Sequence, residues 1–228
     1  MNIVIFGGGD PNKLGNQLGR RAQMQGHRVV SISHCNYHNN DLEIIVADNN
    51  VCSSLQQAVD KLGSVDMVLY CTKNHVNSPL TAESFDTGIV PLEEYNKTLF
   101  TDVIAPHQLM SLAHQRRWST HFVYFTTNLA VSFLPEQNQH HSTYIGGKAW
   151  QLHLMRAVSS IQSTVTATAF SIHFDWNGSD ANQEKLEYLY NLVMSYRKNG
   201  AIVSAYNVNR AQILELDVLK HAPYITQL

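Results

Sequence analysis

Short apolar runs alternate with amphipathic segments along most of the chain. The apolar runs are continuous rather than alternating with polar residues, which is typical of parallel strands covered on both faces. They lie at residues 3–6, 28–32, 43–46, 67–70, 122–125, 165–170 and 202–205. Between them apolar residues recur at helical spacing, as at Leu14, Leu18 and Ala22. This alternation predicts right-handed βαβ units and an α/β fold built on a doubly wound parallel sheet of about seven strands.

Length and composition fit a single globular unit. The chain has 228 residues, of which 44% are hydrophobic, and it shows no internal repeat, low-complexity tract or linker. We therefore expect one domain over residues 1–228. The chain has no apolar run near the ~18 residues of a membrane helix and no signal-peptide pattern at its start, so we expect a cytoplasmic protein without a membrane partner.

The net charge and the spacing of possible metal ligands indicate which kinds of partner this chain does not bind. The net charge is −2, and no Lys/Arg run exceeds two residues, so the sequence lacks the basic surface typical of nucleic-acid binding. The chain has 12 histidines and 3 cysteines, but they show neither a helical His-x-x-x-His motif nor a Cys-x-x-Cys pair. We expect no metal site. The adjacent His140 and His141 are candidates for substrate contact, or else exposed loop residues.

A glycine-rich turn follows the first apolar run. It contains the candidate phosphate-binding residues Gly7, Gly9, Asn12, Lys13, Leu14 and Gly15. A strand, a small-residue turn and a helix start in this order suit a dinucleotide, because the backbone can approach the pyrophosphate and the helix N-terminus presents free N–H groups. The alternative is a glycine turn with only a structural role.

The end of the second apolar run bears on which dinucleotide binds. Rossmann-type sites that prefer NAD usually place a carboxylate there to hold the ribose hydroxyls. This chain has Ser33 and His34 instead, with no acid before Asp41. The missing carboxylate, with Lys13 nearby, favours NADP over NAD. The alternative is that Ser33 and His34 only form a solvated strand end.

The sharpest chemical motif is the pair Tyr144 and Lys148, the only Tyr-x-x-x-Lys in the chain. It follows the fifth apolar run, and its spacing places both side chains on one helix face. A nearby ammonium favours phenolate and so lowers a tyrosine pKa from about 10, which suits Tyr144 to proton transfer. Gly146 and Gly147 weaken a helix by ~1 kcal/mol each, which indicates a close approach by a cofactor or a neighbouring backbone. The alternative is an incidental pair on an exposed helix.

Over roughly residues 1–206, the chain resembles the short-chain dehydrogenase/reductase family. The resemblance places Gly9 and Gly15 at the first and last glycines of the family's Gly-x-x-x-Gly-x-Gly turn, with Lys13 replacing the middle glycine. It also places Asp48 at the acidic position that contacts the adenine ring. The family's Asn-Asn-Ala-Gly after the fourth strand is replaced by residues 70–73, Tyr-Cys-Thr-Lys, so the chain looks like a divergent member.

The resemblance also implies a catalytic set. Tyr144 would transfer the proton, and Lys148 would tune it and hold the nicotinamide ribose. Thr127 falls on the position of the family's catalytic serine, where its hydroxyl would orient the substrate oxygen. Asp102 falls on the position of the catalytic asparagine, so an acid replaces an amide and the charge changes.

These implications favour an oxidoreductase that transfers a hydride between NADP or NAD and a small carbonyl or alcohol substrate. The alternative is a catalytically degenerate member that binds the nucleotide as a sensor or scaffold, favoured by the departures at Lys13, Asp102 and residues 70–73. A methyltransferase of similar fold would give Tyr144 and Lys148 no role.

Self-association is also implied. In the family, the helices on either side of the fifth strand build a two-fold interface, and here these would be about residues 92–113 and 143–160. The second contains Trp150, Leu152, Leu154 and Met155 on more than one helix face. We expect a homodimer or homotetramer, the alternative being that these residues pack on the sheet.

Overall fold

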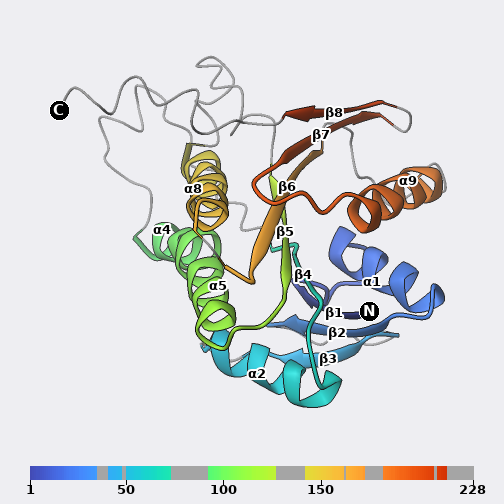
Figure 1. The fold of residues 1–228 in the computed structure, drawn as a ribbon, viewed down its shortest axis with the longest axis horizontal. Coiled ribbons are helices and arrows are strands. Elements are labelled where there is room, and N and C mark those ends of the chain that lie inside the picture. The colour runs from blue at the N-terminus through green and yellow to red at the C-terminus, as the bar shows by residue number, and fades with distance from the viewer. Residues whose placement is uncertain are drawn as a thin grey trace.

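Parallel strands form the centre of the molecule in a computed structural model that describes residues 1–34, 41–47, 50–72, 92–126, 142–161, 163–172, 182–207 and 210–214. One sheet has the strand order β3-β2-β1-β4-β5-β6-β7-β8 (Figure 1). The strands are β1 Asn2–Phe6, β2 Arg28–Ser33, β3 Glu43–Val46, β4 Met67–Tyr70, β5 His121–Thr126, β6 Thr166–Ile172, β7 Ile202–Asn207 and β8 Arg210–Leu214. Strands β1 to β7 pair in parallel, which confirms the fold class expected from the sequence.

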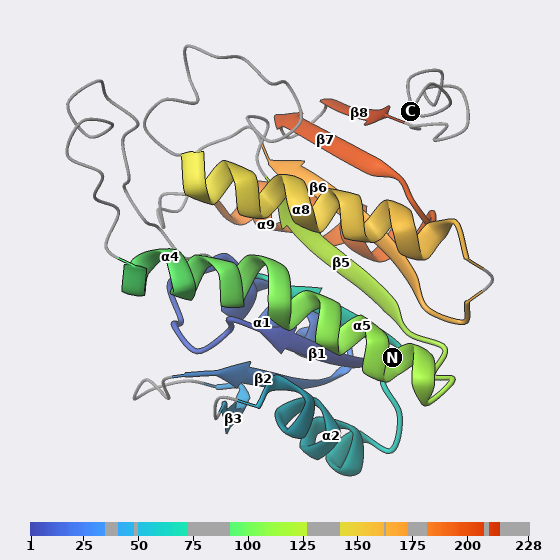
Figure 2. The ribbon, with the colours of Figure 1, turned by 90° about the vertical axis from the view of Figure 1, so that its left-hand side faces the viewer.

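Helices cover both faces of this sheet. They are α1 Leu14–Met24, α2 Val51–Leu62, α4 Leu92–Leu99, the π-helical turn η1 Phe100–Ile104, α5 Ala105–Gln115, α8 Ser142–Ser159 and α9 Asn182–Ser195. Helices α2, α5 and α8 lie on one face, and α1 and α9 lie on the other (Figures 1 and 2). Within the described ranges, no helix is both long and apolar enough to cross a lipid bilayer.

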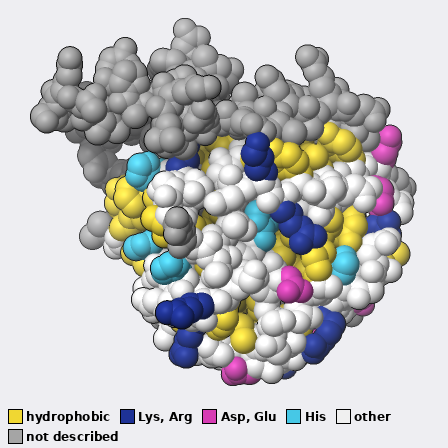
Figure 3. All heavy atoms as spheres, viewed as in Figure 1, with side chains coloured by type: hydrophobic (Ala, Val, Ile, Leu, Met, Phe, Trp, Pro, Cys, Tyr) yellow, Lys and Arg dark blue, Asp and Glu magenta, His cyan; other side chains and the backbone are white. Residues whose placement is uncertain are grey.

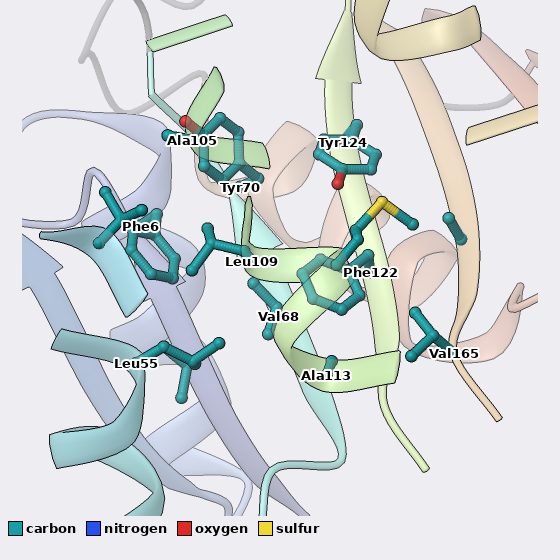
Figure 4. Packing of buried hydrophobic residues seen from close by; sticks show 14 of the residues in the cluster. Phe6, Leu55, Val68, Tyr70, Ala105, Leu109, Ala113, Phe122, Tyr124 and Val165 are labelled. Atoms are coloured by element: carbon teal, nitrogen blue, oxygen red, sulfur yellow. The ribbon is translucent and has the colours of Figure 1, made fainter. Parts of the chain in front are cut away.

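The continuous apolar runs explain why the strands are buried on both sides. In β1, Val4 and Phe6 pack under α2 and α5, whereas Ile3 and Ile5 pack under α1 and α9. Every second side chain points to the same face of a strand, so a strand between two helical layers needs apolar residues at successive positions. Figure 4 shows the first layer, where Phe6 lies beside other buried residues of the sheet and of α5.

Local signals set the ends of the helices. The Asn50 side chain accepts a hydrogen bond from the Ser53 amide at 3.1 Å and caps α2. At the other end Gly63 has φ +82°, and its amide donates to the Val59 carbonyl. The expected helix over 92–113 is interrupted by η1, whose wider turn contains Asp102.

The functionally important feature of the topology is the reversal of strand order beside β1. Strand β1 pairs with β2 on one side and with β4 on the other. The connections leave β1 and β4 toward opposite faces, so the carboxyl ends of these strands bound a crevice. The sequence analysis did not anticipate β8, which pairs antiparallel with β7 at the sheet edge, because its five residues lack a long apolar run.

The outer surface shows no concentration of one charge on the face drawn in Figure 3. Among the residues coloured there, Lys and Arg side chains lie interspersed with acidic side chains, histidines and apolar patches. This distribution agrees with the net charge of −2.

Candidate active site

The glycine turn between β1 and α1 packs directly on the end of β4. Gly7 has φ +88°, and a Cβ there would lie 3.0 Å from the amide nitrogen of Thr72. A Cβ at Gly15 would lie 2.9 Å from the Cβ of Cys71 and 3.0 Å from the Gly7 carbonyl oxygen. A side chain at either glycine would force these backbones apart. The turn therefore depends on glycine at both positions.

The N-terminus of α1 lies open at the end of this turn. No side chain caps the helix, and its first turn contains no acidic residue. Lys13 stands at the N-cap position with extended backbone, next to the exposed Asn12. The Asn16 side chain donates to the Gly8 carbonyl at 2.8 Å and fixes the turn against the helix. An anion at this end would meet backbone N–H groups and the positive end of the helix dipole.

A cleft lies beside Gly7, at the reversal point of the sheet. Its walls come from the ends of β1, β2 and β4, the start of α2, and η1. They are formed by Phe6, Gly7, Ile32, Ser33, His34, Ala47, Val51, Tyr70, Thr72, Phe100, Thr101 and Ala105. The Tyr70 hydroxyl donates to the Thr101 carbonyl, which ties β4 to η1. The described lining is mostly apolar and aromatic and includes no carboxylate.

Lys148 lies on the other side of Thr72, in a buried polar cluster. Its ammonium donates to the Thr72 carbonyl at 3.2 Å and to Asp102 Oδ1 at 3.1 Å. It also donates to Gln151 Oε1 at 3.3 Å, and Gln151 Nε2 donates to the same Asp102 oxygen at 3.0 Å. Lys148 is 1% exposed, and Asp102 and Gln151 are fully buried. An ion pair at this depth is stabilised only if such hydrogen bonds replace the lost water.

Gly147 lets Asp102 approach α8. A Cβ at position 147 would lie 2.7 Å from the Cβ of Asp102 and 2.9 Å from its Oδ2. The π-helical turn η1 supplies the other half of the contact, because it presents Asp102 toward α8. Gly146 and Gly147 were predicted to admit a cofactor or a neighbouring backbone. The neighbour found at Gly147 is instead the Asp102 side chain, and a Cβ at Gly146 would meet none of the described residues within 4 Å.

Burial dominates the electrostatics around this cluster. It raises the pKa of Asp102, while the Lys148 charge and the hydrogen bonds from Lys148 and Gln151 act in the opposite direction. It also raises the pKa values of Tyr70, Cys71 and Tyr124, which therefore stay neutral at physiological pH.

The described residues among those predicted from the sequence fall into four groups. Gly7 and Gly15 meet at the end of β4, and Ser33 and His34 line the cleft. Asp102 and Lys148 form the ion pair. The remaining residues lie along the turn into α1: Gly9, Asn12, Lys13 and Leu14.

Tyr144 lies on α8 one turn before Lys148, but its side chain is outside the described part of the chain. Thr127, Asp48, His140 and His141 are also outside it, so their assigned roles stay predictions. Within the described ranges, no three His, Cys, Asp or Glu side chains gather at metal-binding distance.

Sequence reasoning missed Gln151 and Thr72. Gln151 follows Lys148 by three residues and so shares its helix face, which would have marked it as a candidate. Thr72 takes part through its backbone, and backbone groups leave no signal in residue identity.

The fold has clear counterparts among solved structures. No protein-family model and no curated protein matches the sequence. A blue fluorescent protein from a metagenomic library, solved with NADPH, is 18% identical with a TM-score of 0.69, over 90% of this chain and 96% of that one. A short-chain dehydrogenase from Bacillus anthracis is 12% identical with a TM-score of 0.65, over 90% and 94%.

A third structure is 3-ketoacyl-(acyl-carrier-protein) reductase from Brucella melitensis complexed with NADH. It is 13% identical with a TM-score of 0.64, over 89% of this chain and 95% of that one. Because the likeness spans nearly the full length of both chains in all three cases, this chain has the same fold.

The buried pair generates a stability prediction. Replacing Lys148 alone with methionine leaves Asp102 without its counter-ion. We expect the free energy of unfolding to fall by about 3–5 kcal/mol. The double variant Asp102→Asn/Lys148→Met removes both charges and should lose clearly less. Urea denaturation of both variants and the parent chain measures the difference, and equal losses would contradict a paired role.

Proposed function

We propose that this chain, which has the fold of the short-chain dehydrogenases, is a divergent member of that family. It would act as an NAD(P)-dependent oxidoreductase on a small carbonyl or alcohol. One observation carries the proposal: the glycine turn and the Tyr144–Lys148 helix meet at the same residue. Gly7 packs on the amide side of Thr72, and the Lys148 ammonium donates to its carbonyl. A dinucleotide bound across this sheet edge would extend from the glycine turn to Lys148.

The described residues fit such a cofactor. The uncapped start of α1, with Gly7, Gly15 and Lys13, would hold the diphosphate, and the apolar cleft beside Gly7 would hold the adenine. To hold the nicotinamide ribose, Lys148 would give up one of its three hydrogen bonds to Thr72, Asp102 and Gln151. The bound nicotinamide would supply or accept the hydride. The blue fluorescent protein and the Brucella reductase were solved with NADPH and NADH, which agrees with this assignment.

The chain's own residues would carry out the proton transfer. Tyr144 would donate the proton to, or remove it from, the substrate oxygen. The hydroxyl of Thr127 would orient that oxygen. Asp102 and Gln151 hold the Lys148 ammonium from behind, inside the protein, and so fix its position on α8.

The cleft favours NADP over NAD. Ser33 and His34 lie at the end of β2, and the described residues that line the cleft include no carboxylate to hold a free 2′-hydroxyl. Asp41, the next acid in the sequence, forms an ion pair with Arg20 at 2.7 Å.

We expect calorimetric titration to show NADP binding roughly tenfold tighter than NAD, a difference of about 1.4 kcal/mol. Gly15→Val should abolish binding of both, because its side chain would displace the turn from β4. Gly146→Ala is the matched control, since a Cβ there meets none of the described residues within 4 Å, and it should bind as the parent does. Undiminished binding in Gly15→Val would exclude this turn as the cofactor site.

Tyr144→Phe tests catalysis. We expect hydride transfer to a panel of small carbonyls to fall by about 10²–10⁴-fold with cofactor affinity nearly unchanged, because only the proton donor is lost. Tyr95→Phe, at an exposed tyrosine on α4, is the control and should keep full activity. Equal turnover in Tyr144→Phe would remove Tyr144 from the mechanism. Tight cofactor binding without turnover in the parent chain would favour the sensor or scaffold function.

We also propose that the chain forms a homodimer or homotetramer through α4, η1 and α8. These elements lie side by side on one face of the molecule (Figure 2). Among their described side chains, four large apolar ones are exposed: Tyr95 (49%), Leu99 (37%), Ile104 (39%) and Trp150 (48%). Leu152, Leu154 and Met155, by contrast, belong to the core. Of the four apolar residues named on this helix, Trp150 is therefore the one available to a second copy.

Light scattering after size exclusion tests this surface. The double variant Ile104→Glu/Trp150→Glu places charges in the proposed interface and should weaken self-association at least about tenfold, giving monomers at micromolar concentration. Met24→Glu changes an exposed apolar residue on α1, on the opposite face of the sheet, and should leave the mass unchanged. A parent chain that is monomeric at all concentrations would contradict the proposal.

A further inference from the structure

The ion pair of Lys148 and Asp102 places one charge of each sign inside the protein. The ammonium nitrogen and the carboxylate oxygen are 3.1 Å apart, and both side chains are almost fully buried. Charges interact far more strongly in such surroundings than in water. The electrostatic effect of Lys148 on the acidity of a neighbouring group therefore depends on the charge of Asp102.

Within the described part of the chain, the other ionisable groups near this pair are neutral. Tyr70 and Cys71 lie at the end of β4 and interact with the pair, and Tyr124 on β5 lies beside Tyr70. Burial raises the pKa of each of them, so none supplies a negative charge at physiological pH. Among the described residues, Asp102 is the group that opposes the charge of Lys148.

The residues around Asp102 hold its carboxylate in place as a hydrogen-bond acceptor. Gln151 donates through Nε2 to Asp102 Oδ1 and accepts through Oε1 from Lys148, so it contacts both partners of the pair. Gly147 leaves room for the carboxylate on the other side, where any Cβ would press against it. The pair is therefore held by contacts from α8 and η1 together.

We infer that Asp102 is a positioning residue that compensates the charge of Lys148 and so keeps the Tyr144 phenol less acidic than it would be with an amide at position 102. An uncompensated ammonium favours the phenolate, whereas an ammonium paired with a carboxylate presents almost no net charge to it. For the proton transfer of the proposed function, on which this inference rests, Tyr144 would work at a more alkaline pH.

Titration of tyrosinate absorbance in the full chain tests this without turnover. The signal of Tyr144 is obtained by subtracting the Tyr144→Phe form of each protein. Asp102→Asn removes the negative charge that opposes Lys148, so we expect the Tyr144 midpoint to fall by about one pH unit. Asp60→Asn removes the same charge from an exposed position on α2 and should not move it. An unchanged midpoint in Asp102→Asn would overturn the inference.

A second variant covers the case in which Asp102→Asn fails to fold. In Asp102→Asn/Lys148→Met both charges are gone, so complete compensation predicts a midpoint within roughly half a pH unit of the parent value. A midpoint raised by about one unit or more would show that Lys148 acts uncompensated, and would likewise overturn the inference.

Turnover separates this inference from the proposed function. If the parent chain turns over none of the carbonyls tested, the oxidoreductase proposal is contradicted. The titrations would still decide the role of Asp102. If turnover exists, the acid limb of alcohol oxidation, on which Tyr144 becomes protonated, should move to lower pH in Asp102→Asn in parallel with the Tyr144 midpoint.

Discussion

The close approach of two backbones at the end of β4 is the constraint on which the rest of the site depends. Gly7 packs on Thr72, and Gly15 packs on Gly7 and Cys71, at distances that leave no room for a side chain. This contact brings the start of α1 to the end of β4, where Lys148 also reaches the Thr72 carbonyl. The cleft, the helix N-terminus and the buried pair are neighbours because the two strands and the turn meet so tightly.

The buried pair illustrates a compromise between stability and position. Taking a lysine and an aspartate out of water is costly, and apolar residues of similar volume often stabilise a protein as well or better. The chain nevertheless surrounds the pair with Gln151, the Thr72 carbonyl and the space left by Gly147. The benefit is an ammonium held in one position at the sheet edge. The ammonium of a mobile lysine would have no fixed position or orientation there.

Most of the fold was predictable because its signals are local. Continuous apolar runs mark strands covered on both faces, and each of the seven expected runs became a parallel strand. The π-helical turn around Asp102 was not predicted, although Pro106 is a local signal for it. Proline has no N–H to donate to the carbonyl of residue 102, and its ring crowds that carbonyl. The antiparallel β8 was missed because an edge strand needs no long apolar run.

By itself, the sequence determined the order of strands and helices, the glycines of the first turn and the spacing of Tyr144 and Lys148. Each of these follows from backbone geometry within a few residues. Only the tertiary structure decided that Asp102 faces Lys148, that Gln151 joins them, and that Thr72 lies between the lysine and the glycine turn. These contacts join residues distant in the chain, and whether a charge is buried and paired depends on the packing of whole elements rather than on the residues beside it.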